Sequence, residues 1–291
     1  SKAGALGRKA AHKAGVAQIY HTFHGHVFHS YFGTLKTNLY KKIERNLAKK
    51  STKIIAISEI QKKELNEVHQ ICPANKIVVI PLGFDLARFY TNKEEKRINF
   101  RKEWNINDDE IAIGIIGRIV PIKDHAFFVN VIEKVLQKTS QKIRVFIVGD
   151  GEDKSKIQEL IGSKKMTYSE NKERATFQFT SWIKEIDLLN AGMDIICLTS
   201  KNEGTPVSLI EAQASGKPIV STNVGGIENV IIPNKTALLS QVGDLDQFSN
   251  NLIQLIEDKA LRFSMEKLGQ KKSLEFSYNK LIENTNSLYS M

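Results

Sequence analysis

Short runs rich in Ile and Val alternate with helix-like segments between residues 111 and 240. The expected strands are 111–117, 143–148, 176–179, 194–198 and 218–221, with a last short strand at 236–239. Strands and helices alternating at this spacing predict right-handed crossovers, and therefore a parallel sheet. Because the runs are apolar throughout, we expect helices to cover both faces of the sheet. The pattern predicts an α/β, Rossmann-like domain whose ligand lies beyond the carboxyl ends of the strands.

The chain of 291 residues is long enough for two domains. Further strands are expected upstream, at 16–20, 53–57 and 77–80. A strongly charged stretch at 90–110 separates the two sets of strands. We therefore expect one domain over residues 1–90, a second over 91–275, and a final helical segment over 276–291.

The net charge of the chain is concentrated in its first third. Residues 1–90 contain 15 Lys/Arg and 5 Asp/Glu, whereas residues 91–291 contain 27 of each. This asymmetry is consistent with an ordinary solvated basic face. It is equally consistent with attraction to an anionic membrane surface or an anionic acceptor. Nucleic acid is not favoured, because no recognition motif accompanies the charge.

The cysteines, the histidines and the hydropathy of the chain indicate whether a metal site or a membrane span is expected. Cys72 and Cys197 are too far apart to form a metal motif, and we expect two reduced thiols in a cytoplasmic protein. No apolar run approaches the roughly 20 residues needed to cross a bilayer. Five of the seven histidines lie between residues 12 and 29, but no Cys or carboxylate completes a ligand set. We therefore expect neither a metal nor a cofactor, and assign His24 to hydrogen bonding with a sugar hydroxyl.

Two carboxylates eight residues apart, Glu203 and Glu211, flank a predicted helix start at Thr205 or Pro206. The unpaired amides and the dipole at a helix N-terminus favour a phosphate. Glu203 precedes the helix and Glu211 lies about two turns inside it, on the same side. The two carboxylates are then positioned for the two ends of a ligand with a phosphate in its middle, which is the shape of a nucleotide-sugar.

The expected strand ends carry further polar groups. Arg118 follows Gly117 at the end of one strand and Lys123 lies five residues on, so two cations are available for a diphosphate. They are also consistent with an ordinary charged surface. Glycine turns follow other strands, but none forms a dinucleotide-binding or P-loop motif, so dehydrogenase and P-loop functions are not favoured. Gly225 and Gly226 predict a close backbone approach, either to a ligand or to a neighbouring strand.

Taken in order, these motifs resemble glycosyltransferase family 4. They are Gly117-Arg118 with Lys123, Val148-Gly149-Asp150-Gly151, Trp182, Glu203-Gly204-Thr205-Pro206 with Glu211, the run 214–220, and Gly225-Gly226. The resemblance covers essentially the whole chain and implies a GT-B fold with two Rossmann-like domains. It also implies that the N-terminal domain is incomplete, and we expect roughly 80–100 further residues upstream. The segment 276–291 is implied to cross back to the N-terminal domain.

The resemblance also implies roles for individual residues. Arg118 and Lys123 would hold the donor diphosphate, Glu211 the nucleotide ribose, and Glu203 and His24 the donor sugar. The remaining donor-binding positions lie in loops; they are Gly83, Gly117, Gly149, Gly151, Trp182, Gly204, Thr205, Pro206 and Val207. The sequence departs from the family at Ser181, where a glycine usually precedes the tryptophan.

The implied function is transfer of a sugar, with retention and without a metal, from a nucleotide-sugar that we expect to be UDP-linked. The expected acceptor is a saccharide or a polyprenyl-linked sugar in surface polysaccharide synthesis, handled in the cytoplasm and at the inner face of the membrane. Two alternatives stay open. One is a donor-binding fragment without turnover. The other is a GT-B nucleotide-sugar epimerase, which would act without an acceptor and would need acidic residues that the sequence does not show.

Overall fold

The structure is a computed structural model that describes residues 2–24 and 34–290. It consists of two compact units. Unit 1 comprises Ser1–Phe84 together with Phe276–Met291, and unit 2 comprises Asp85–Glu275. Unit 1 contains 15 Lys/Arg and 5 Asp/Glu, so the whole net charge of +10 belongs to it.

Unit 2 is built on a seven-stranded sheet in which every pairing is parallel. Its strands are β4 (Glu110–Ile116), β5 (Lys142–Val148), β6 (Tyr168–Ser169), β7 (Phe177–Phe179), β8 (Ile195–Leu198), β9 (Ile219–Thr222) and β10 (Ala237–Ser240). Their order is β10-β9-β8-β4-β5-β7-β6, so the chain adds strands first on one side of β4 and then on the other. The reversal occurs between β4 and β8, and this is where α/β sheets bind their ligands.

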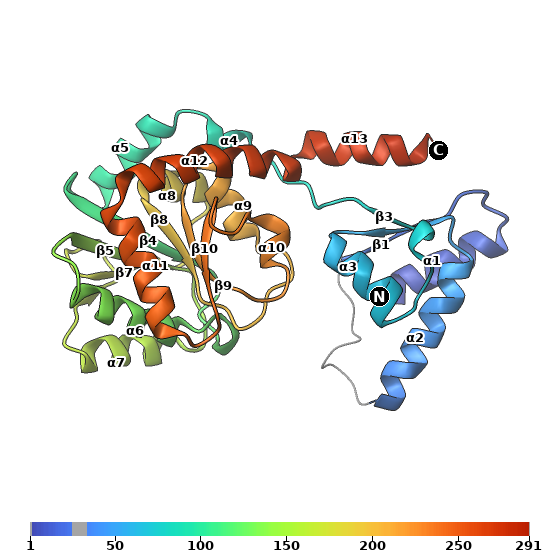
Figure 1. The fold of residues 1–291 in the computed structure, drawn as a ribbon, viewed down its shortest axis with the longest axis horizontal. Coiled ribbons are helices and arrows are strands. Elements are labelled where there is room, and N and C mark those ends of the chain that lie inside the picture. The colour runs from blue at the N-terminus through green and yellow to red at the C-terminus, as the bar shows by residue number, and fades with distance from the viewer. Residues whose placement is uncertain (1, 25–33, 291) are drawn as a thin grey trace. The chain divides into compact units, whose positions relative to one another are not determined.

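Helices cover both faces of this sheet, which confirms the expectation from the uninterrupted apolar strands (Figure 1). One face carries α6 (His125–Leu136), α7 (Lys154–Ser163) and α11 (Leu245–Glu257). The other carries α4 (Ala87–Tyr90), α5 (Lys93–Glu103), α8 (Ile186–Gly192), α9 (Val207–Ala214) and α12 (Lys259–Ser273). A short helix, α10 (Ile227–Val230), follows β9. Core strand residues such as Ile113, Val145 and Ile196 are fully buried, and each such side chain contributes about 1.5–3 kcal/mol to folding.

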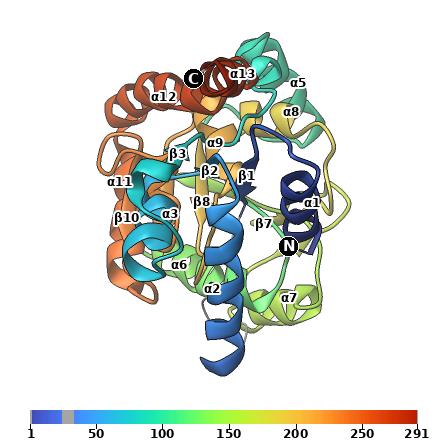
Figure 2. The same cartoon turned by 90° about the vertical axis from the view of Figure 1, so that its right-hand side faces the viewer.

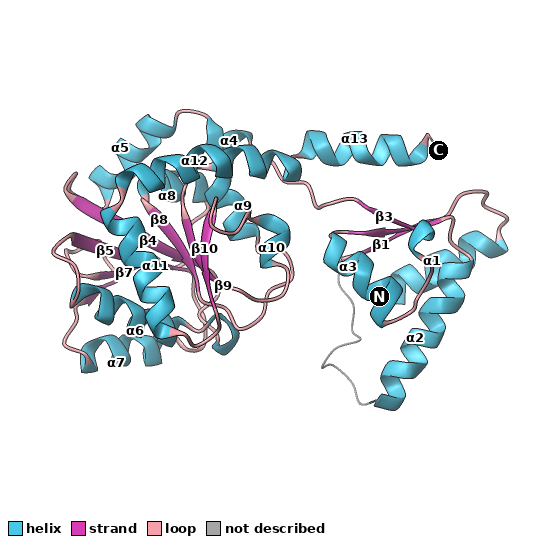
Figure 3. Cartoon of the chain, in the orientation of Figure 1, coloured by secondary structure: helices cyan, strands magenta, loops and turns pink. Residues whose placement is uncertain are grey.

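Unit 1 contains a smaller parallel sheet, β1-β2-β3, shown in magenta in Figure 3. Its elements are α1 (Lys2–Lys13), β1 (Tyr20–Phe23), α2 (Thr34–Lys49), β2 (Lys53–Ala56), α3 (Glu59–Lys63), a π-helical turn (Glu64–Val68), β3 (Ile77–Val79) and α13 (Tyr278–Tyr289). In Figure 2, α1 and α3 lie on opposite sides of α2. Ile54 packs toward Leu65 on one face of the sheet, and Ile55 packs with Leu288 of α13 on the other.

The expected strand at 16–20 was wrong, because β1 spans Tyr20–Phe23. The reason is the way α1 ends. Gly15 adopts a φ of +71°, and the amide of Val16 donates to the carbonyl of Ala11 at 3.0 Å. This helix-terminating turn uses the residues before Ile19 to reverse the chain, so the strand can begin only after them.

Gly83 lies against α13, where a Cβ atom would be 2.6 Å from Leu281 Cβ and 3.2 Å from the carbonyl oxygen of Ser277. The neighbouring amide of Phe84 donates to the carbonyl of Phe276 at 2.8 Å, which fixes the start of this segment. Gly83 is therefore required for packing within unit 1.

We predict that Gly83→Ala lowers the free energy of unfolding by about 1–3 kcal/mol, because the added methyl overpacks the contact with α13. Urea denaturation followed by circular dichroism would measure this change. Gly7→Ala is the matched control, since Gly7 lies in α1 with no atom within 4 Å of the added Cβ. That control should stabilise the protein by about 0.5–1 kcal/mol, and equal effects of the two substitutions would contradict the prediction.

Candidate functional site

Predicted site residues gather at the carboxyl ends of β4 and β8, the point at which the strand order reverses. Arg118 follows β4 after Gly117, and the loop from Thr199 to Glu203 follows β8. The two loops are joined through their backbones, since the amide of Lys201 donates to the carbonyl of Ile122 at 2.8 Å. Residues 80 positions apart in the chain therefore form one surface.

An ion pair between Lys123 and Glu203 lies at the centre of this surface. A single 3-10 turn, Pro121–Lys123, places Lys123 Nζ 2.5 Å from Glu203 Oε1. The Ser200 hydroxyl donates to the same oxygen at 2.6 Å. The Lys123 side chain is 25% exposed and that of Glu203 10%, so solvent screens the pair only partly. Lys123, which was expected at the donor diphosphate, and Glu203, which was expected at the donor sugar, are therefore in direct contact.

Arg118 differs from Lys123 in its availability. Its side chain is exposed, and within residues 2–24 and 34–290 it has no hydrogen-bonded or ionic partner. The candidate site thus combines one cation that is already neutralised by a carboxylate with one that can pair with an incoming anion. A guanidinium is suited to that task because its planar N–H donors match phosphate oxygens in pairs.

Gly225 and Gly226 allow the loop after β9 to pack against the loop after β8. A Cβ on Gly225 would lie 2.0 Å from the carbonyl oxygen of Glu203, and one on Gly226 would lie 1.8 Å from that of Gly204. The amide of Gly226 also donates to the carbonyl of Glu203 at 3.0 Å. The close approach left open by the sequence is therefore made to a neighbouring loop.

Gly149 and Gly151 hold the loop after β5 against the loop after β4 in the same way. A Cβ on Gly149 would lie 2.1 Å from the carbonyl oxygen of Gly117, and one on Gly151 would lie 2.2 Å from that of Ile119. Neither position tolerates a side chain without a backbone shift. Whether these glycines also contact a donor remains a prediction.

Ser181 adopts the conformation for which the family usually supplies a glycine. Its φ is +53°, a left-handed backbone that costs a non-glycine residue roughly 1–2 kcal/mol. Its hydroxyl donates to Asp150 at 3.2 Å, and its carbonyl accepts from the amide of Gly149 at 2.9 Å. These bonds offset the strain of the left-handed conformation. Trp182, which follows, is 60% exposed.

The second predicted carboxylate lies on α9. This helix begins at Val207 with Pro206 as its N-cap, one residue later than the latest expected start. Gly204 and Val207 are exposed, Thr205 is half-buried and Pro206 is buried. Glu211 is half-buried, and burial raises its pKa to about 7; nearby Asp187 raises it further while Arg88 opposes the shift.

Two predicted residues belong to unit 1 rather than to this surface. His24 is exposed immediately after β1, and Gly83 packs on α13. His26 and His29, part of the histidine cluster, lie outside the described residues. The role of His24 stays a prediction.

One buried group near the site was not singled out from the sequence. His125 begins α6, two residues after Lys123, and is 3% exposed. Burial, with a smaller contribution from Lys123, lowers its pKa to about 4, so the imidazole is neutral at neutral pH. No signal in the sequence indicated that this histidine, at the start of a helix, would be buried beside the loop that carries Lys123.

Comparison with known proteins gives the family. The family model for glycosyl transferases group 1 matches residues 96–272, which is more than half of the chain. The chain belongs to this glycosyltransferase family. A second family model, glycosyltransferase family 4, matches residues 1–88 of this chain.

Similar proteins carry glycosyltransferase names. An Escherichia coli UDP-Gal:alpha-D-GlcNAc-diphosphoundecaprenol alpha-1,3-galactosyltransferase is 29% identical, over 99% of this chain and 73% of the relative. The Bacillus anthracis N-acetyl-alpha-D-glucosaminyl L-malate synthase is 26% identical, over 80% of this chain and 58% of the relative. The Staphylococcus aureus capsular polysaccharide biosynthesis glycosyltransferase CapM is 26% identical, over 82% and 62% respectively.

Solved structures agree on the fold. Anabaena Alr3699/HepE in complex with UDP superposes with a TM-score of 0.84 at 20% identity, covering 100% of this glycosyltransferase and 77% of that chain. The α/β architecture with parallel sheets in both units matches the GT-B class, as the sequence predicted. Within the described residues, no helix is both long enough and apolar enough to span a membrane.

We predict that Glu211→Gln raises the free energy of unfolding more at pH 8 than at pH 5. Because the pKa of Glu211 is about 7 when folded and 4.5 ordinarily, the folded state binds more protons between these values. The penalty for ionising the carboxylate grows from about pH 4.5 and is complete above about pH 7, reaching about 1–3 kcal/mol. Denaturant unfolding at the two pH values tests this, and an equal effect at both would contradict it.

Proposed function

We propose that the chain transfers a sugar from a UDP-linked donor to a saccharide or polyprenyl-linked acceptor, with retention, in the synthesis of surface polysaccharide. The observation that carries the proposal is the Lys123–Glu203 pair beside the unpaired Arg118, all at the strand-order reversal. The names of the E. coli and S. aureus relatives support the donor class and the type of acceptor.

The chemistry follows from where charge develops. Breaking the bond between the anomeric carbon and the donor phosphate leaves negative charge on the diphosphate and positive charge on the sugar. Arg118, Lys123 and the N-terminus of α9 would stabilise the departing diphosphate, and electrostatic stabilisation of this kind usually contributes most to the rate enhancement. Because Lys123 is held by Glu203, it is already in place before the donor binds. This preorganisation lowers the cost of the step.

The carboxylates would orient the donor. Glu203, fixed by Lys123 and Ser200, is assigned to the sugar hydroxyls rather than to covalent attack. Glu211 would accept hydrogen bonds from the ribose hydroxyls, and its ionised form is the better acceptor. His24 is proposed to face the donor sugar. With retention, the acceptor hydroxyl attacks on the face from which the nucleotide departs.

We further propose that turnover needs no divalent metal, because cationic side chains would supply the charge that a metal otherwise provides. The proposed location is the cytoplasm and the inner face of the membrane, where unit 1 would meet anionic lipid. The excess of positive charge in unit 1 supports this location.

We predict that UDP binds with micromolar affinity in the presence of chelator, and that Glu211→Ala abolishes this binding. Calorimetric titration, with GDP and ADP for comparison, would measure both.

We predict that Lys123→Ala lowers kcat with a UDP-sugar by about 10²–10³-fold. The same variant should lower the free energy of unfolding by only about 1–3 kcal/mol, because the Glu203 carboxylate is left without its partner.

Lys142→Ala is the control, because Lys142 makes an exposed ion pair with Asp109 at the amino ends of the strands, away from the candidate site. It should leave turnover unchanged. Near-normal kcat in a folded Lys123→Ala variant would refute the role of Lys123. UDP binding without transfer to any acceptor would favour a donor-binding protein, and donor hydrolysis without an acceptor would favour an epimerase.

The membrane proposal has its own test. We predict that the protein co-sediments with vesicles containing phosphatidylglycerol but not with pure phosphatidylcholine vesicles, and that binding falls as salt rises from about 0.05 to about 0.5 M because the charges become screened. Equal binding to both vesicle types would contradict attraction to anionic lipid.

A further inference from the structure

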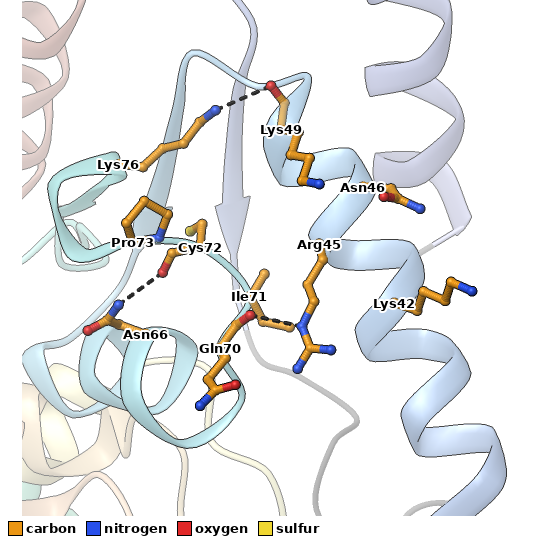
Figure 4. Close-up of a pocket in the computed structure, with 10 residues that line it drawn as sticks. All are labelled: Lys42, Arg45, Asn46, Lys49, Asn66, Gln70, Ile71, Cys72, Pro73 and Lys76. Carbon is orange, nitrogen blue, oxygen red and sulfur yellow. Dashed lines mark hydrogen bonds between the residues drawn. The ribbon is translucent and has the colours of Figure 1, made fainter.

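A pocket of about 730 Å³ lies in unit 1, between the second half of α2 and the segment leading into β3 (Figure 4). This volume is within the range of about 300–1,000 Å³ that small-molecule sites occupy. Ile71, Cys72 and Pro73 form the largely apolar part of its lining. The pocket belongs entirely to unit 1, so its geometry does not depend on unit 2.

The charged residues that line the pocket all have the same sign. Four cations, Lys42, Arg45, Lys49 and Lys76, contribute to it, and no carboxylate is among its lining residues in the described chain. The only acid of α2, Glu44, is instead paired with Arg8 of α1 at 2.7 Å. Because α1 and α3 lie on opposite sides of α2, this carboxylate does not neutralise the pocket (Figure 2). The charged lining of the pocket is therefore cationic.

The cationic side chains of the pocket have N–H groups that are not used in hydrogen bonds within the protein. Arg45 is fixed by hydrogen bonds to the carbonyls of His69 and Gln70, both at 2.9 Å, which leaves three of its five N–H groups unused. Lys76 Nζ donates to the carbonyl of Lys49 at 3.3 Å and retains two further protons. The Lys49 side chain is exposed and has no partner within the described residues. Figure 4 shows Arg45 reaching from α2 toward Gln70.

The pocket lies at the amino ends of the strands. Lys49 precedes β2, and Lys76 directly precedes β3. His24, the proposed donor contact in this unit, follows the carboxyl end of β1. Since the strands are parallel and β2 has four residues, these edges are separated by about 13 Å. A ligand in the pocket is therefore distinct from a donor near His24.

We propose that this pocket binds a phosphate group carried by an organic molecule. Lys49 and Lys76, which lie next to each other at one end of the pocket, donate to the phosphate oxygens, and the lining at Ile71–Pro73 contacts the adjoining carbon chain (Figure 4). The phosphate belongs either to a soluble phosphoester or diphosphate or to a phospholipid headgroup. These sources share the chemistry that the pocket recognises, and they are separated by the experiment.

Cys72 supplies a reporter inside the pocket, because it is half-buried there while Cys197 is fully buried. Iodoacetamide, which is uncharged, should therefore modify Cys72 first in the folded protein. We predict that inorganic pyrophosphate or glycerol 3-phosphate slows this modification at least about fivefold and saturably, at an ionic strength held constant with chloride. Mass spectrometry of the alkylated peptide gives the rate.

Two double variants make the test specific. Lys49→Met/Lys76→Met should abolish the protection, whereas Lys9→Met/Lys13→Met removes the same charge from α1 and should preserve it. The ratio of rates with and without phosphate is compared within each variant, so a change in the intrinsic reactivity of Cys72 does not affect the result. Far-UV circular dichroism confirms that each variant is folded.

The vesicle arm identifies the source. Protection by soluble phosphate compounds assigns a soluble ligand, and protection only by phosphatidylglycerol vesicles, relative to phosphatidylcholine, assigns a lipid headgroup. Protection by neither, or protection that survives Lys49→Met/Lys76→Met, overturns the proposal. None of these readouts requires glycosyl transfer, so they are independent of the proposed function.

Discussion

The candidate site depends on loops that pack backbone against backbone at the carboxyl edge of the large sheet. At Gly149, Gly151, Gly225 and Gly226 a Cβ atom would lie between 1.8 and 2.2 Å from a neighbouring carbonyl oxygen. No side chain fits at such distances, so only glycine allows the loops after β4, β5, β8 and β9 to meet. Arg118, Lys123 and Glu203 are carried on these loops, so their positions follow from these contacts.

The charged groups of the site differ in how far each is compensated within the protein. Lys123 is compensated by Glu203 before any ligand arrives, and the partly buried pair therefore leaves neither charge unpaired. Arg118 is exposed to solvent, where its hydration is retained. The half-buried Glu211 is the costly member, and its raised pKa shows that the fold holds a carboxylate where charge is disfavoured. Such local cost at a carboxylate is common where a protein binds or transforms a ligand.

Local patterns were sufficient to predict six of the seven strands of the large sheet and their parallel arrangement. They failed where the outcome depends on distant parts of the chain. The two-residue strand β6 is too short to show a pattern, and β1 shifted because Gly15 ends α1 with a turn. The contact between Lys123 and Glu203 could not be predicted, since it requires two loops joined through backbone bonds 80 residues apart in sequence. At Ser181, where the family usually has a glycine, a hydrogen bond to Asp150 supports a left-handed backbone conformation that the sequence alone did not predict.

The uneven division of charge has a thermodynamic consequence for the chain as a whole. Unit 1 carries a net charge of +10 and unit 2 is neutral, so folding concentrates like charges in one half only. Mutual repulsion weakens unit 1 in dilute buffer, and counterions relieve it once the Debye length falls to about 8–10 Å. Unit 2 has no net charge, so this repulsion is absent from it. Added salt is therefore expected to stabilise unit 1 through a contribution that unit 2 lacks, and an anionic surface would act in the same direction.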